Sequence, residues 1–409
     1  MSIKTVRSVV ALIGATLLTL VALPAQAFTP TVSELRYPPG VDPGDSWNGA
    51  AITSDATTFV VTDSANPAGL WVIDVVANSA TSVTGTPSAS EVIIDDAGAY
   101  AYSFGSHTTE NVYKIDLSTN AVVATWTDPA LTLQSDSQMF FSADGSSLYM
   151  VGLVGNYPYA TGVAKVNLAS GAITQYVASG SSGDIATGGA AYDTASGHIF
   201  IQYQDIATGL TSGFYDFNTT ANTFTDVPWS GSGVLSACDL KSGVWVCLVD
   251  DTNPYITKID STGSATGAPL AVDAAVTSVE SVTLTPDGSQ AYVFGTNTAP
   301  SANNRGSAQV VDTTTMSSVT VLNFDFDYSH KVVLAPDAGQ IWFTSDYFGD
   351  YDGGYQVVQF TDPNAGSGEE LAKTGPNSAI AGTLAALSAL ALAAGVLTRV
   401  ATRRHRARS

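Results

Sequence analysis

A pattern of two apolar strands around an Asp-containing turn recurs seven times in this chain of 409 residues. Two copies align without a gap, SVTLTPDGSQAYVFG from Ser281 and KVVLAPDAGQIWFTS from Lys331. With one aspartate of each copy as a marker, the repeats fall at Asp55, Asp96, Asp144, Asp193, Asp239, Asp287 and Asp337, on average 47 residues apart. This period predicts a repeat architecture in which each unit buries its apolar face against its neighbours.

Each unit predicts four short antiparallel strands. The turn is followed by a strand rich in Val, Tyr, Phe and Trp, which is typical of a β-hairpin. A third strand ends in Asp or Asn in most units, as in LWVID at Asp74, and a fourth strand follows a polar turn. Four strands every 40 to 50 residues predict an all-β, seven-bladed β-propeller, and the absence of a helical period in this region excludes a helical solenoid.

The two ends of the repeat region complement each other. The seventh unit has no fourth strand, whereas the segment TVSELRY, residues 31–37, precedes the first unit without a partner. We expect this N-terminal strand to fill the outer position of the seventh blade, which would cover an otherwise open sheet edge.

The turns Pro286-Asp287-Gly288 and Pro336-Asp337-Ala338 resemble those of YVTN-type and WD-type propeller repeats. The resemblance covers essentially the whole region between the two termini and implies the propeller fold. It assigns no chemistry, because such scaffolds have many functions.

The N-terminus has the features of a signal peptide. Lys4 and Arg7 precede the apolar run VVALIGATLLTLVAL, and Ala25 and Ala27 supply the small residues that signal peptidase requires. We expect residues 1–27 to form the signal helix, with cleavage before Phe28, so that the chain is exported.

The C-terminus combines three elements in a fixed order. The segment LAKTG, residues 371–375, precedes an uncharged stretch, residues 379–397, that is long enough to cross a bilayer as a transmembrane helix. Five arginines follow and favour a cytoplasmic end: Arg399, Arg403, Arg404, Arg406 and Arg408.

This order resembles the cell-wall sorting signal of Gram-positive surface proteins, whose usual form is Leu-Pro-x-Thr-Gly (LPXTG). Ala372 replaces the proline, as in Leu-Ala-x-Thr-Gly (LAXTG) signals, which implies a class E sortase. By this resemblance, the sortase recognises Leu371 and Ala372, attacks the carbonyl of Thr374, releases Gly375 onward and joins Thr374 to the peptidoglycan precursor. The alternative is a simple membrane tail in which LAKTG occurs by chance.

These features predict a signal peptide (1–27), a propeller (28–362), a linker (363–370), the sorting motif (371–375) and the apolar span with its basic tail (376–409). All 36 acidic residues but only 8 of the 15 Lys and Arg lie between Phe28 and Thr374, which gives 8 − 36 = −28. Such a charge makes nucleic acid an improbable partner. Membrane contact is expected only through the C-terminal helix before sorting.

The chain has two cysteines, Cys238 and Cys247. A two-residue turn at Ser242-Gly243 would place them opposite each other in a non-hydrogen-bonded pair, close enough for a disulfide. We expect the bond because the chain is exported, with two buried thiols as the alternative.

In a propeller, the loops between the second and third strands lie on one face, together with the connections between blades. These loops are long here and carry aromatic residues, which suit binding to sugars or peptides. The candidate ligand-binding residues are Arg305, Tyr347, Tyr351, Tyr157 and Tyr159. Asp346, Asp350 and Asp352 could bind Ca²⁺, with a solvated acidic loop as the alternative.

No catalytic constellation stands out. The histidines after the signal peptide and before the basic tail are His107, His198 and His330, in three different repeats. We therefore predict a wall-anchored module that binds or adheres to a glycan or protein, without enzymatic activity. The alternatives are an extracellular hydrolase or lactonase, because propeller lactonases resemble this fold, and a purely structural coat protein.

Overall fold

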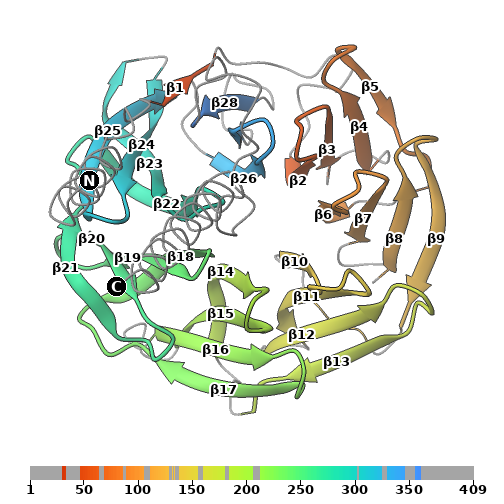
Figure 1. The fold of residues 1–409 in the computed structure, drawn as a ribbon, viewed down its shortest axis with the longest axis horizontal. Coiled ribbons are helices and arrows are strands. Elements are labelled where there is room, and N and C mark those ends of the chain that lie inside the picture. The colour runs from red at the N-terminus through yellow and green to blue at the C-terminus, as the bar shows by residue number, and fades with distance from the viewer. Residues whose placement is uncertain are drawn as a thin grey trace, which may run out of the picture. The chain divides into compact units, whose positions relative to one another are not determined.

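The computed structural model describes residues 30–360, apart from 34–46, 64–68, 86–88, 106–110, 129–130, 132, 134–137, 155–159, 180–183, 206–211, 302–303, 325–328 and 346–354. The chain divides into two compact units, residues 1–362 and 363–409. In the described part, all regular elements are β-strands, and they form seven four-stranded sheets. The predicted all-β, seven-bladed propeller is confirmed, and Figure 1 shows the blades arranged in a ring.

Blades 1 to 4 each use four consecutive strands. Blade 1 contains β2 (Trp47–Ile52), β3 (Thr58–Asp63), β4 (Leu70–Asp74) and β5 (Ser79–Ser82). Blade 2 contains β6 (Ala89–Ile94), β7 (Tyr100–Gly105), β8 (Asn111–Asp116) and β9 (Ala121–Thr127). Blade 3 contains β10 (Gln138–Phe141), β11 (Ser147–Val154), β12 (Ala160–Asn167) and β13 (Ile173–Val177). Blade 4 contains β14 (Asp184–Asp193), β15 (His198–Asp205), β16 (Ser212–Asn218) and β17 (Thr223–Pro228).

Blades 5 and 6 follow the same order, and blade 7 combines both ends of the repeat region. Blade 5 contains β18 (Val234–Lys241), β19 (Val244–Asp250), β20 (Tyr255–Ile259) and β21 (Ala265–Ala271). Blade 6 contains β22 (Val276–Leu284), β23 (Gln290–Ser301), β24 (Asn304–Asp312) and β25 (Ser317–Phe324). Blade 7 contains β26 (Ser329–Ala335), β27 (Gln340–Ser345), β28 (Tyr355–Gln359) and β1 (Thr31–Val32).

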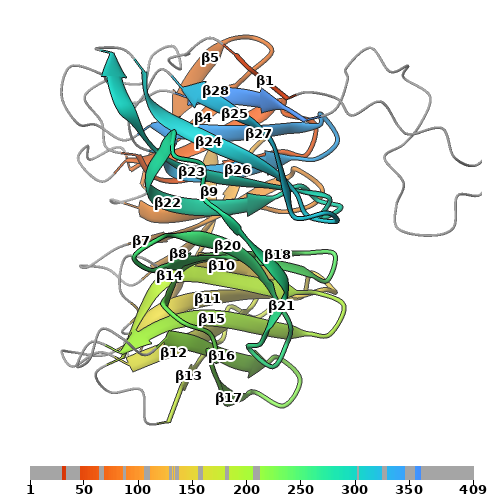
Figure 2. The ribbon, with the colours of Figure 1, turned by 90° about the vertical axis from the view of Figure 1, so that its left-hand side faces the viewer.

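The N-terminal strand closes the ring, as predicted. β1 pairs antiparallel with β28, with Thr31 opposite Gln359 and Val32 opposite Val358 (Figure 2). The backbone N–H of Ser33 donates to the carbonyl of Val357 over 2.8 Å, which extends the pairing by one residue. The strand is shorter than the predicted segment 31–37, whose residues 34–37 lie outside the described part.

Seven apolar clusters occupy the interfaces between neighbouring blades. The cluster between blades 7 and 1 includes Phe59, Trp342 and Tyr355, and the Trp342 and Tyr355 rings stack with centroids 4.5 Å apart. Val32 of β1 packs against the cluster between blades 6 and 7. Each blade therefore buries both of its faces against neighbours, which explains why the repeat needs a closed ring.

The turn between the first two strands has a recurring hydrogen-bond network. In blade 6, the Thr285 hydroxyl donates to Asp287 over 2.6 Å, and the same carboxylate accepts from the N–H and hydroxyl of Ser289. Asp55 and Asp144 accept equivalent bonds in blades 1 and 3. This network explains the choice of Asp and the hydroxyl residues in these turns.

Not every marker aspartate belongs to that turn network. The Asp337 carboxylate, for example, accepts from the Ser54 hydroxyl of blade 1 over 2.6 Å. In blade 2, Asp95 rather than Asp96 accepts the turn bonds, from the N–H groups of Ala99 and Tyr100. In blade 5, Asp239 lies within β18, because the turn contains only Ser242 and Gly243. Asp239 was therefore wrong as a turn residue, whereas Asp96 does lie in the turn between β6 and β7, and the period of the repeat was right.

The expected disulfide is present. Cys238 and Cys247 lie directly opposite in the β18–β19 pair, and a disulfide joins them with Cα atoms 4.1 Å apart. The predicted signal peptide, sorting motif and apolar span lie outside the described residues. Within the described strands and turns there is no helix with the length and apolar character of a membrane span.

Candidate binding site in the central channel

Most of the predicted ligand-binding residues lie outside the described part of the chain. This applies to Tyr157, Tyr159, Tyr347 and Tyr351, and to the predicted Ca²⁺ ligands Asp346, Asp350 and Asp352. The backbone of Arg305 belongs to β24 in blade 6. The described residues instead bring together a different set of polar groups, at the centre of the ring.

A cavity of about 490 Å³ lies at this centre and is lined by the innermost strand of every blade. These strands are β2, β6, β10, β14, β18, β22 and β26. The volume lies within the range of small-molecule sites, roughly 300–1,000 Å³. The channel is therefore large enough for a ligand of a few sugar or amino-acid units.

Four polar side chains that line this cavity occupy the same register position in their blades. Glu91, Gln138, Ser281 and Lys331 each lie opposite the fifth residue of the neighbouring second strand. In two other blades the same position holds a small residue, Gly49 opposite Thr62 and Ala237 opposite Leu248, and in blade 4 Gly189 lies within the register shift between Ala186 and Ala190. We call Glu91, Gln138, Ser281 and Lys331 the polar ring.

The inner strands are irregular where the polar ring lies. The strand pairing changes register at or next to this position in six blades, for example between Ala89 and Glu91 and between Ser329 and Lys331. Such bulges re-aim side chains at barrel rims and near functional sites. The polar ring also lies toward the face of the connections between blades, because the chain enters each inner strand from that side.

An ion pair joins two members of the polar ring that lie on either side of blade 1. The Lys331 ammonium lies 2.6 Å from Oε2 of Glu91, although the two residues belong to blades 7 and 2. Both side chains are largely buried, with 26% exposure for Lys331 and 11% for Glu91. Blade 1 has Gly49 and the buried Ala50 at this level, so no large side chain separates the pair.

Gln138 connects blades 3 and 4 in a similar way. Its Oε1 accepts a hydrogen bond from the backbone N–H of Ala190, on the inner edge of β14, over 2.5 Å. The amide lies against Gly189, where a Cβ atom would be 2.7 Å from Nε2 of Gln138. Gly189 also has a φ of 112°, so this position favours glycine for two separate reasons.

Asp239 has the same bridging role at the other end of the channel. Its Oδ2 accepts from the N–H of Leu284, on the inner edge of β22, over 2.8 Å. Its Oδ1 lies 3.8 Å from the Lys241 ammonium. The cavity lining thus contains two carboxylates and two ammonium groups, and it is charge-balanced within a chain of net charge −21.

The two carboxylates of the cavity lining belong to blades that are not adjacent in the ring. Glu91 belongs to β6 of blade 2 and Asp239 to β18 of blade 5, with two intervening blades on one side and three on the other. Each carboxylate forms an ion pair with a different lysine, Glu91 with Lys331 and Asp239 with Lys241. Among the described residues there is also no cluster of three His, Cys, Asp or Glu side chains arranged to hold a metal ion.

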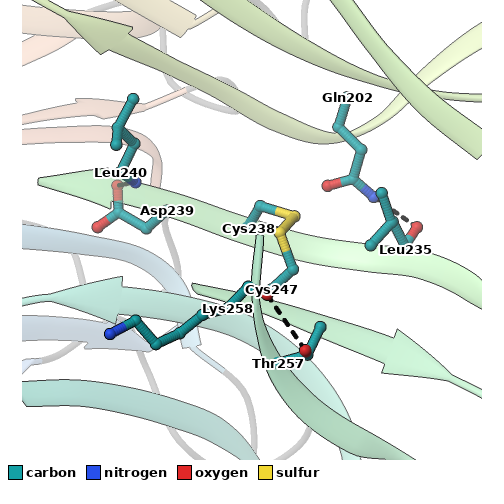
Figure 3. The surroundings of a disulfide bond; sticks show 8 residues. All are labelled: Gln202, Leu235, Cys238, Asp239, Leu240, Cys247, Thr257 and Lys258. Atoms are coloured by element: carbon teal, nitrogen blue, oxygen red, sulfur yellow. Dashed lines mark hydrogen bonds between the residues drawn. A yellow bond between two sulfur atoms is a disulfide. The ribbon is translucent and has the colours of Figure 1, made fainter. Parts of the chain in front are cut away.

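Figure 3 shows the surroundings of the disulfide, which include Asp239 of the cavity lining. Cys238 contributes to the cavity lining, whereas Cys247 is fully buried. A second void, of about 10 Å³, lies between blades 4 and 5 next to Cys238 and Gln202. Gln202 donates to the carbonyl of Leu235, while its buried Oε1 has no partner among the described residues, so the void suits a single water molecule.

His198 belongs to a different part of blade 4. Its Nδ1 lies 2.7 Å from Oδ1 of Asp216, and its Nε2 lies 3.2 Å from Nδ2 of Asn218. The ring also stacks on Phe200. Because both ring nitrogens and one face contact neighbouring side chains, His198 ties β15 to β16.

Sequence reasoning missed the polar ring. Its partners are far apart in the chain, and Glu91 and Lys331 are separated by 240 residues. A signal was nevertheless present, because an alignment of all seven inner strands places Glu91, Gln138, Ser281 and Lys331 in one column.

No protein-family profile matches the chain, and no curated protein matches it. Among solved structures, a chain of Kuenenia stuttgartiensis hydrazine synthase is similar to it. The match covers 68% of this chain and 83% of that chain, with 14% sequence identity and a TM-score of 0.47. This likeness carries no inference about chemistry.

Proposed function

We propose that the protein is an exported surface protein whose propeller binds an extracellular glycan or protein ligand. The combination that carries this proposal is a repeat ring with an open central cavity, followed in the same chain by LAKTG, an apolar stretch and a basic tail. The tail supports display at the cell wall, by sortase-catalysed transfer of Thr374 to peptidoglycan. The cavity supports a role in binding.

The face that carries the connections between blades is the proposed binding face. The polar ring lies at that end of the channel, and we propose that Tyr157, Tyr159, Tyr347 and Tyr351, which follow the second strands of blades 3 and 7 in the sequence, contribute to the same face. Arg305 would add a planar donor group for hydroxyl-rich or anionic ligands. We propose Ca²⁺ binding by Asp346, Asp350 and Asp352 only as an aid to ordering this face.

A hydrolase that uses two carboxylates would need them on either side of one scissile bond. Glu91 and Asp239 lie in separate parts of the ring, and each pairs with a lysine. This arrangement favours binding over hydrolysis as the function of the channel.

An array of glycans and matrix proteins, probed with the exported chain, tests the binding function. We expect selective binding to a small set of related ligands. The variant Arg305→Ala/Tyr347→Ala/Tyr351→Ala should lose this binding while its melting temperature stays within a few degrees, because loop substitutions usually cost under about 0.5 kcal/mol. A chain that binds nothing on the array would contradict a binding function, and full binding by the variant would place the site elsewhere on the ring.

A further inference from the structure

We infer that the polar ring in the channel binds a neutral, hydroxyl-rich ligand, such as a mono- or disaccharide. This inference rests on the proposed binding function and specifies where and how the ligand is recognised. It follows from the charge balance of the cavity, from the chemistry of the polar ring and from the apolar wall beside it.

The charge balance disfavours a charged ligand. Glu91 is paired with Lys331, and Asp239 lies near Lys241, so neither an anion nor a cation finds an unpaired counter-charge among these four groups. A charged ligand would have to break one of these pairs and leave a partly buried charge without compensation, which is costly. A neutral ligand can contact both members of a pair without separating them.

The polar ring contains the donors and acceptors that hydroxyl groups require. The Glu91 carboxylate accepts hydrogen bonds, the Lys331 ammonium donates them, and the Gln138 amide has both kinds of atom. Ser281 belongs to the cavity lining, and its buried hydroxyl has no hydrogen-bond partner among the described residues. A buried polar group of this kind needs an explanation, and a ligand hydroxyl would supply its partner.

The wall next to the polar ring suits the C–H faces of a sugar ring. Ile93, Phe140 and Val332 line the same cavity, and Phe140 is only partly buried. An aromatic ring next to convergent hydrogen-bonding groups is a common composition for a small-molecule site. Gly49 and Ala50 of blade 1 are buried and place no large side chain at the level of the ion pair.

Isothermal titration calorimetry with the full chain tests this inference. The probes are five neutral sugars (glucose, galactose, mannose, N-acetylglucosamine and maltose) and two charged analogues, glucuronate and glucosamine. We expect at least one neutral sugar to bind, and glucuronate and glucosamine to bind about tenfold or more weakly than that sugar. Binding of none of the neutral sugars, or equal or tighter binding of a charged analogue, would overturn the inference.

Three variants locate the site. Glu91→Gln/Lys331→Met removes the ion pair without leaving a lone charge, and Ser281→Ala removes only the unpartnered hydroxyl. We expect about a tenfold or greater loss of sugar affinity for the first and a smaller loss for the second. The control is Lys165→Gln, because Lys165 lies on β12 with its ammonium over the Tyr149 ring, 5.5 Å from the centroid, and does not line the cavity.

The variants also distinguish the two proposals. If Glu91→Gln/Lys331→Met and Ser281→Ala bind sugars as the parent chain does, the channel is not the site. If the double variant still binds its ligand on the glycan and matrix array, the surface-binding function stands and only the channel inference fails. Both variants must be folded and melt cooperatively near the melting temperature of the parent chain. If the double variant does not fold, the sugar affinity of Ser281→Ala alone tests whether the channel is the site.

Discussion

The carboxylate of Asp144 accepts hydrogen bonds from the Ser142 hydroxyl over 2.6 Å and from the N–H and hydroxyl of Ser146. These bonds, the Ser142 hydroxyl foremost, lower the pKa of Asp144 to about 2. At Asp55, the Thr53 hydroxyl is likewise the main cause of a lowered pKa. At Asp287, burial acts to raise the pKa, and the combined bonds from Thr285 and Ser289 outweigh it.

The substitution Asp144→Asn tests this turn at the residue scale. Because the folded-state pKa is below the unfolded value, the carboxylate stabilises the fold above about pH 4, and this contribution is lost as the pH falls through about 2. Urea unfolding from pH 2 to pH 7 should therefore show a destabilised variant near neutral pH and a smaller difference from wild type in acid. Asp96→Asn is the matched control, since Asp96 is exposed and accepts none of the turn bonds of blade 2. An equal effect of both substitutions at pH 7 would contradict the account.

Gly189→Ala is the second residue-scale prediction. The added Cβ would lie 2.7 Å from Nε2 of Gln138 at a φ of 112°. We expect a loss of unfolding free energy of about 1–3 kcal/mol, from strain and from displacement of the Gln138 amide. Gly243→Ala has a positive φ of 74° but open space around the Cβ, so it separates backbone strain from the clash. An equal cost for both would show that the Gln138 contact does not matter.

At the scale of elements, the sequence predicted those pairings that depend only on residues close together in the chain. The Cys238–Cys247 pairing followed from counting outward from Ser242-Gly243, because register in a hairpin is fixed by its turn. The bridging role of Asp239 could not be obtained in this way. Its function depends on the N–H of Leu284 in the next blade, and contacts between blades leave no local pattern.

The disulfide should stabilise blade 5 modestly. It joins residues 9 positions apart, so it restricts only a short loop of the unfolded chain. We expect reduction to lower the unfolding free energy by about 2 kcal/mol. Chemical unfolding with and without a thiol reductant measures this, and Cys238→Ala/Cys247→Ala should not respond to the reductant. No change in the wild type would contradict a stabilising bond.

The short strand β1 has a larger expected effect than its length suggests. It pairs with β28, and Ser33 accepts a bond from Gln356 Nε2 through its carbonyl and from the Val357 N–H through its hydroxyl. Deletion of residues 28–33 should expose the β28 edge and the cluster that Val32 covers, and lower the melting temperature by about 5 °C or more. Calorimetry measures this, with deletion of residues 363–368 as a control of equal length. An unchanged melting temperature after the N-terminal deletion would show that the ring does not need this strand.

For the whole molecule, the period of 47 residues and the incomplete seventh unit were enough to predict seven blades and their closure. The channel could not be predicted in the same way, because Glu91 and Lys331 meet only when blades 2 and 7 flank the small residues of blade 1. The chain's net charge of −21 likewise gives no indication that the channel lining is charge-balanced. The proposed binding therefore depends on contacts that exist only in the closed ring, and the proposed display at the cell wall depends on the termini.

Mass spectrometry of the mature C-terminus tests the central claim, display at the cell wall, most directly. After digestion of the wall with a peptidoglycan hydrolase, we expect the protein to end at Thr374, in amide linkage to a peptidoglycan fragment. The variant Thr374→Ala should instead remain in the membrane fraction with its tail through Ser409. A wild-type protein that is extracted by detergent alone and still ends at Ser409 would contradict covalent anchoring.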